Sequence, residues 1–140
     1  MCRLVCYVST LNSETDLNEV KSLFDFVSIR NAEMKLTGVL FFSDNNFLQI
    51  LEGDFDTVGG LFDKIEKDNM HHDVIKIIDE DETKRMFDNY FFGFLTVTSS
   101  EDKQWMNFFL EKECEPQNKS QKVVVELMKK FLQRFQPIAN

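Results

Sequence analysis

The segment that most restricts how this chain can fold is FFSDNNFLQILEGDF, residues 41–55. Two apolar runs flank a polar turn, Ser43 to Asn46, and this pattern is typical of a β-hairpin. The second arm carries an uncharged amide, Gln49, among apolar neighbours. A buried amide without partners costs roughly 1 to 3 kcal/mol, so Gln49 either lies on a solvated face or bonds to a specific group.

Periodic patterns on both sides of this hairpin predict the other elements of the fold. Asp16 resembles a helix N-cap, with Glu19 three residues later. The predicted elements are strand 3–9, helix 16–32, strands 35–43 and 46–53, a helix from about residue 56, strand 73–81, a turn or short helix at 83–89, and strand 90–99. This order indicates an α+β fold, the ferredoxin-like split βαβ sandwich, in which two helices cover one face of a five-stranded mixed sheet.

Two details concern the helices. The apolar stripe of the first helix is predicted to comprise Leu17, Val20, Leu23, Phe24, Val27 and Ile29. Near the start of the second helix, Gly59 and Gly60 lower helix propensity by about 1 kcal/mol each relative to Ala. They also permit a close approach of this helix to the sheet.

The pattern changes after about residue 98, so we divide the chain into residues 1–98 and a helical extension, 99–140. Trp105, Phe108 and Phe109 mark a short helix, and a polar break follows at 113–120. A final amphipathic helix carries the apolar residues Val124, Leu127, Met128, Phe131, Leu132 and Phe135. We expect this stripe to pack on the remaining sheet face or on a partner, because exposing it to solvent is unfavourable.

Length and charge restrict the class of protein. The 140 residues suit a single domain, and the net charge of −8 argues against nucleic acid or an anionic membrane as the main partner. No apolar run approaches the roughly 20 residues of a membrane span, and no signal peptide is visible, so we expect a cytoplasmic protein. Three cysteines without CxxC spacing favour free thiols.

Catalytic and metal-binding motifs do not stand out. The two histidines, His71 and His72, are adjacent and point in different directions, so we predict no metal site. What remains is Tyr7 in the first strand, Gln49 in the third and Asn31 at the end of the first helix. Strands one and three are neighbours in the expected sheet, so Tyr7 and Gln49 can project from the same face. These residues alone fit a satisfied core pair better than a cofactor site, although one Tyr cannot satisfy every donor and acceptor of Gln49.

Three segments stand in a characteristic order and spacing: LVCYVS, RNAEMKLTGVLFFSDNNFLQILEGD and KIEKDNMHHDV. Together they resemble the BLUF domain, a blue-light photoreceptor module that uses a flavin. The resemblance implies FAD, or FMN, with its isoalloxazine ring between the two helices. Tyr7 would be the electron and proton donor to the excited flavin, and Gln49 would bridge Tyr7 to the ring. Asn31 would bond the pyrimidine edge, with Arg30 near O2. The ring would be lined by Leu23, Phe24, Val27 and Ile65, and its edge, ribityl chain or phosphates would be faced by Lys64, Asp68 and His71.

Some positions depart from the family pattern. Tyr90 and Phe92 stand where the family commonly has Trp and Met in strand five, so Tyr90 becomes a candidate second electron donor. Phe92 lacks the weak acceptor of a thioether, which affects the route from Gln49 to the output surface. Ser9 is expected to bond the strand-five residue. Met70 replaces an Arg, which weakens the expected phosphate clamp and leaves the choice between FAD and FMN open.

The resulting prediction is a blue-light photoreceptor, not an enzyme, that signals to a downstream protein partner. Self-association into a dimer or a larger oligomer is expected from the apolar final helix. The alternative is a flavin-binding or protein-binding regulatory module of the same fold without photochemistry. An acylphosphatase-like hydrolase shares the topology, but the loop after the first strand has no glycine or basic residue to hold an anion.

Overall fold

The computed structural model describes residues 2–82, 84–87 and 94–137. These residues form a five-stranded sheet with the strand order β4-β1-β3-β2-β5. The strands are β1 (Cys2–Leu11), β2 (Thr37–Ser43), β3 (Asn46–Gly53), β4 (His71–Glu82) and β5 (Phe94–Val97). β1 is antiparallel to β3 and β4, β2 is antiparallel to β3, and β2 is parallel to β5. The sheet is therefore mixed, as predicted, and β1 and β3 are neighbours.

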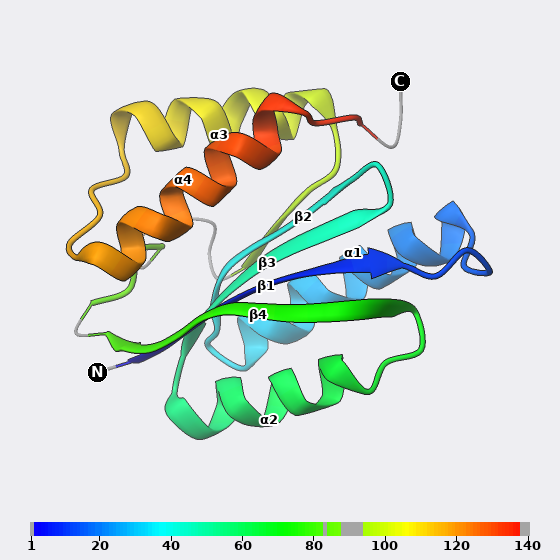
Figure 1. Ribbon diagram of the computed structural model, residues 1–140, viewed down its shortest axis with the longest axis horizontal. Helices are drawn as coiled ribbons and strands as arrows, with labels where there is room; N and C mark the ends of the chain where they lie inside the picture. Colours follow the sequence, from blue (N-terminus) through cyan, green and yellow to red (C-terminus); the bar gives the residue numbers. More distant parts are fainter. Residues whose placement is uncertain (1, 83, 88–93, 138–140) are drawn as a thin grey trace.

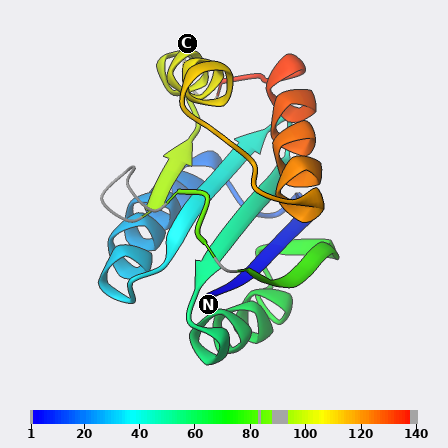
Figure 2. The same ribbon diagram turned by 90° about the vertical axis from the view of Figure 1, so that its left-hand side faces the viewer.

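Helices cover both faces of this sheet (Figures 1 and 2). α1 (Leu17–Glu33) and α2 (Phe55–Glu66) lie on one face, and α3 (Ser100–Lys112) and α4 (Lys119–Gln133) lie on the other. The α+β, ferredoxin-like arrangement predicted from the sequence is confirmed, and so is the packing of the C-terminal helices against the remaining sheet face.

The alternation of side chains along the strands produces two cores. On the α3/α4 side, Leu4 and Cys6 of β1 belong to one buried cluster with Met128 of α4. On the α1/α2 side, Val5 and Tyr7 belong to a second cluster. Because successive strand residues point to opposite faces, a strand that is apolar at every position serves both clusters.

Local side chains determine where several elements begin and turn. Asp16 caps α1 by accepting the Glu19 N–H at 2.9 Å, as predicted. Asp54 caps α2, so this helix begins at Phe55, one residue earlier than expected. The hairpin turn contains Asp44 and Asn45 with φ of 50° and 65°, the left-handed region that Asn and Asp tolerate better than most residues.

Other boundaries differ from the sequence prediction for identifiable reasons. β2 begins at Thr37 instead of Lys35, because Lys35 has a φ of 59° that a strand does not accommodate. α3 has 13 residues instead of being short, since Ser99 and Asp102 form a capping box that ends β5 early and starts the helix. β4 is longer than predicted at both ends.

The apolar stripe of α1 is narrower than predicted. Val20 and Phe24 are buried, but Leu17 is 49% exposed and Ile29 is 63% exposed. Ile29 lies two residues after Val27 and therefore on a different face of the helix. Within the part of the predicted turn that the structure describes, residues 84–87 form a bend and a turn. Among the described residues, no helix is both long and apolar enough to cross a membrane.

Candidate functional site

Tyr7 and Gln49 form a buried pair at the centre of the sheet. The β1–β3 register places them directly opposite each other, and their exposed fractions are 4% and 3%. The Tyr7 hydroxyl donates a hydrogen bond to Gln49 Oε1. Burial raises the pKa of Tyr7 far above its ordinary value, and the Asp68 carboxylate adds to this effect. The phenol therefore stays protonated and acts as a donor.

Asn31, near the end of α1, is a buried amide that the protein leaves incomplete. The residue is 2% exposed, and its backbone carbonyl accepts the Leu36 N–H at 2.9 Å. Its side-chain Nδ2 is buried and has no hydrogen-bond partner among the described residues. An unpaired buried donor costs roughly 1 to 3 kcal/mol, so the position is suited to a ligand that supplies an acceptor.

Both amides face one cavity of about 190 Å³ between α1, α2 and the sheet, which we call the inter-helix cavity. Ten of the residues singled out in the sequence line it: Tyr7, Leu23, Val27, Arg30, Asn31, Gln49, Lys64, Ile65, Asp68 and His71. The structure therefore brings together side chains from α1, α2, β1, β3 and β4. The apolar walls and few polar groups of the inter-helix cavity are typical of a small-molecule site.

Phe24 is the sequence candidate that does not line this cavity. Its ring is buried in the core against Phe42 and Phe47, at centroid distances of 5.9 Å and 6.2 Å. Sequence reasoning also missed four lining residues: Phe26, Leu40, Phe47 and Leu61. Helical spacing from Leu23 and Lys64 predicts two of them, and the β2–β3 register, which pairs Leu40 with Gln49, predicts another. Met70 also lines the cavity and was considered only as the replacement of an Arg in the phosphate clamp.

His71 is held by the protein itself at both ring nitrogens. Its Nε2 lies 2.6 Å from the Ile65 carbonyl oxygen and its Nδ1 lies 2.8 Å from Ser9 Oγ. A carbonyl can only accept, so Nε2 carries the proton, and in the neutral ring the Ser9 hydroxyl donates to Nδ1. Neither nitrogen is left for a ligand, so His71 can contribute only its ring surface to the cavity.

Ser9 has a partner that the sequence did not predict. Its hydroxyl contacts His71 of β4. The expected bond from Ser9 to a residue of strand five stays a prediction. Tyr90 and Phe92, the two departures from the family pattern, lie outside the described residues.

The outer part of the cavity carries charge. Arg30 is half-buried, whereas Lys64 and Asp68 are exposed. Asp68 also has a local structural task, because its Oδ1 accepts the Met70 N–H at 2.9 Å in the turn before β4.

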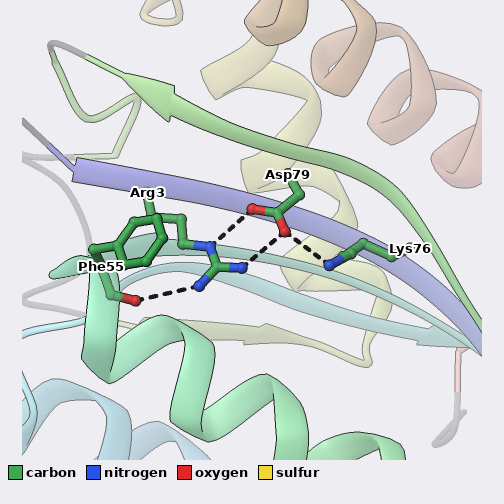
Figure 3. A network of polar contacts seen from close by, with 4 residues as sticks. All are labelled: Arg3, Phe55, Lys76 and Asp79. Carbon is green, nitrogen blue, oxygen red and sulfur yellow. Dashed lines mark hydrogen bonds and ion pairs between the residues drawn. The ribbon is translucent and has the colours of Figure 1, made fainter.

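A network around Arg3 fixes α2, one wall of the cavity, on the sheet (Figure 3). The guanidinium donates two bonds of 2.8 Å to Asp79 and one of 3.4 Å to the Phe55 carbonyl, and lies 4.4 Å from the centre of the Phe55 ring. Lys76 Nζ lies 2.7 Å from the same carboxylate. These two cations, Arg3 first, hold the pKa of Asp79 well below its usual range. A Cβ on Gly59 would lie 2.5 Å from Arg3 Nη1, so glycine there permits the contact.

A sequence comparison identifies the family. The family described as "BLUF: Sensors of blue-light using FAD" matches residues 1–93, about two thirds of the chain. This chain belongs to the BLUF family. Its site fits a flavin, because the unpaired Asn31 donor and the Gln49 amide supply groups for the polar edge of the ring and Leu23, Val27 and Ile65 supply apolar walls. The chain thus belongs to a family that is described as sensing blue light with a flavin.

Known relatives agree with this assignment. The blue light- and temperature-regulated antirepressor BluF of Escherichia coli is 23% identical over 78 residues, covering 56% of this chain and 19% of the relative. The photoactivated adenylate cyclase subunit beta of Euglena longa is 30% identical over 71 residues, covering 51% of this chain and 8% of the relative. The chain therefore spans less than a fifth of either relative.

A solved structure confirms the fold. The BLUF domain of BlrP1, a protein of Klebsiella pneumoniae, has a TM-score of 0.72 with this chain at 22% sequence identity. The similarity covers 99% of this chain and 98% of that structure. It therefore extends beyond the residues that the family comparison matches and includes the C-terminal helices.

Proposed function

We propose that the inter-helix cavity holds the flavin ring and that Tyr7 and Gln49 form the light-responsive switch beside it. The observation that supports this is the buried Tyr7–Gln49 hydrogen bond next to a buried Asn31 donor without a protein partner. A core pair with no ligand would not need an unpaired amide in the same cavity. Asn31 and Gln49 orient the ring, and Leu23, Val27 and Ile65 exclude water around it.

When bound, the flavin would supply the blue-light absorption, and Tyr7 would serve as a reversible donor of an electron and a proton to it. In the dark, Tyr7 keeps its proton because burial raises its pKa. Gln49 accepts a hydrogen bond from this hydroxyl at Oε1. Rotation of the amide would change which of its atoms faces Tyr7, and tautomerisation would turn Oε1 from an acceptor into a donor. The signal is a rearranged hydrogen-bond network that relaxes in the dark.

Replacing Gln49 with Leu tests this switch. Gln49→Leu keeps an uncharged side chain at this position but removes every donor and acceptor, so we expect the flavin to remain bound while the reversible red shift on illumination disappears. Gln104→Leu, an exposed change on α3, is the matched control and should switch normally. A normal shift in Gln49→Leu would contradict the assigned role. A wild-type protein that binds flavin without any shift would support the alternative, a regulatory module without photochemistry.

The route from the switch to the rest of the protein runs along β3. Three residues after Gln49, the buried Glu52 carboxylate accepts the N–H groups of Met86 and Phe87, the latter at 3.1 Å. Gln121 of α4 donates to the Lys84 carbonyl at 3.0 Å. Residues 84–87 are therefore held between the switch strand and α4. We propose that rearrangement at Gln49 reaches α4 through this segment, with residues 1–98 as sensor and 99–140 as the output extension.

The output acts on another protein, and we propose that the chain has no enzymatic activity of its own, that it works in the cytoplasm and that it self-associates as a dimer or larger oligomer. FAD is the proposed flavin, with FMN as the alternative. These proposals rest on the family, on the acidic net charge of −8 and on the absence of a catalytic motif in the sequence.

A further inference from the structure

Phe26 of α1 lies where the inter-helix cavity meets the solvent. Its ring lines the inter-helix cavity, yet the residue is 57% exposed. Leu23, Val27 and Arg30 line the same cavity at helical spacings of three and four residues from one another or from Phe26, so one face of α1 runs from the interior to the solvent. The Arg30 guanidinium carbon lies 5.8 Å from the centre of the Phe26 ring.

The cavity changes character with depth. Its inner end carries the buried amides of Asn31 and Gln49, at 2% and 3% exposure. Its outer end carries the exposed aromatic ring of Phe26, the cations Arg30 and Lys64, and the Asp68 carboxylate. Amides suit the polar edge of an uncharged heterocycle, whereas cations suit phosphate. These cations stand out in a chain with a net charge of −8.

We propose that Phe26 and Arg30 form a platform for the adenine and diphosphate of FAD, and that this platform makes the protein select FAD over FMN. The inference rests on the proposed function, in which the cavity holds the flavin ring. FAD and FMN share the ring, the ribityl chain and the first phosphate, and only FAD carries a second phosphate and an adenosine beyond them. The outer aromatic therefore has a partner in FAD that FMN lacks.

The chemistry of the platform matches that occupant. A flat aromatic face stacks on any base, and base–aromatic stacking is worth about 1 to 3 kcal/mol. A guanidinium adds cation–π attraction to such a ring and forms charge-assisted hydrogen bonds to phosphate. This assigns Arg30 to the dinucleotide tail instead of the ring oxygen O2 that the family resemblance implies. A phosphate contact from Arg30 would also offset the loss of the Arg that the family often has at the position of Met70.

Comparative flavin binding tests the proposal. The full-length protein is stripped of flavin and titrated separately with FAD and FMN, and the dissociation constants are measured from quenching of flavin fluorescence. The wild type should bind FAD at least about fivefold more tightly than FMN. Phe26→Ala should weaken FAD binding by roughly five- to a hundredfold and leave FMN binding within about twofold. Phe26→Trp should keep the preference for FAD.

Ile29→Ala is the matched control, because Ile29 is 63% exposed on the same helix but does not line the cavity. It should leave both dissociation constants unchanged. Equal affinities of the wild type for FAD and FMN would overturn the platform and leave the flavin site intact. An equal loss of both flavins in Phe26→Ala would also overturn it, because Phe26 would then support only the ring site. A wild-type protein that binds neither flavin would instead overturn the proposed function, and the platform with it.

Discussion

Two buried amides, Gln49 and Asn31, differ in what the protein gives them. Gln49 has Tyr7 as a partner, whereas the side-chain nitrogen of Asn31 has none among the described residues. A polar group that is buried and unpaired makes the flavin-free protein less stable, and the bound ligand recovers that loss. A buried polar side chain that has no hydrogen-bond partner in the protein is therefore a sign of a ligand site.

Replacing Asn31 with Leu should separate stability from binding. Asn31→Leu removes the unpaired donor, so the flavin-free variant should be at least as stable as the wild type in thermal unfolding. The same change should weaken flavin binding by roughly five- to a hundredfold, the equivalent of about 1 to 3 kcal/mol for a lost buried hydrogen bond. Unchanged flavin affinity would show that Asn31 does not contact the ligand.

Single residues were predictable where a simple period governs them. Tyr7 and Gln49 could be paired from the sequence because strand side chains alternate and the hairpin fixes the register. The sequence assigned Phe24 to the flavin site, but the structure places it in the core. Adjacent helix residues point in different directions, so Leu23 lines the cavity and Phe24 packs in the core. The bond between Ser9 and His71 depends on tertiary contact between strands whose register contains bulges, which the sequence pattern does not reveal.

Among the elements, the placement of α2 depends on two consecutive glycines with different surroundings. A Cβ on Gly59 would meet Arg3 Nη1 at 2.5 Å, whereas a Cβ on Gly60 would meet nothing within 4 Å. The sequence offered lower helix propensity and close sheet contact as two readings of the pair. In the structure, only Gly59 makes a close contact, and the space around Gly60 is open.

Alanine substitutions at these two positions should therefore differ in their effect on stability. Gly60→Ala should stabilise the protein by up to about 1 kcal/mol, through helix propensity alone. Gly59→Ala should gain the same propensity but push Arg3 Nη1 away from the Phe55 carbonyl, so it should stabilise the protein less than Gly60→Ala does. Urea denaturation measures both. Equal stabilisation by the two variants would show that Arg3 does not restrain α2.

Element boundaries were harder to predict than element types. The sequence contains a strand pattern over 90–99, but β5 ends at Val97 because Ser99 caps α3. The first residue of β2 could not be predicted from the apolar residues, because it depends on the left-handed backbone conformation of Lys35. Caps and turns are short-range features that override a longer periodic pattern at its ends.

At the scale of the whole molecule, the C-terminal helices share a core with the sensor. Met106 and Met128 are fully buried in the same cluster as Leu4 and Ile50 of the sheet. The amphipathic pattern of α4 predicted that its apolar face would be covered, but left the sheet and a partner as alternatives. Only the three-dimensional arrangement shows that the sheet covers it.

This shared core predicts that the sensor and its extension unfold together. Met128→Ala should lower the free energy of unfolding by about 2 to 5 kcal/mol. The exposed change Lys129→Ala on the same helix should have an effect within about 0.5 kcal/mol. Flavin release and loss of helical circular dichroism should coincide during urea denaturation of all three proteins. Loss of helix at a lower urea concentration than flavin release would show that the extension is a separate unit.

The central claim is that light rearranges the hydrogen bonds between Tyr7, Gln49 and a bound flavin. A light-minus-dark absorption spectrum of the purified full-length protein tests it most directly. The account predicts a flavin absorption band that moves to longer wavelength under blue light and returns completely in the dark. A colourless protein, or a flavin band that illumination leaves in place, would contradict it.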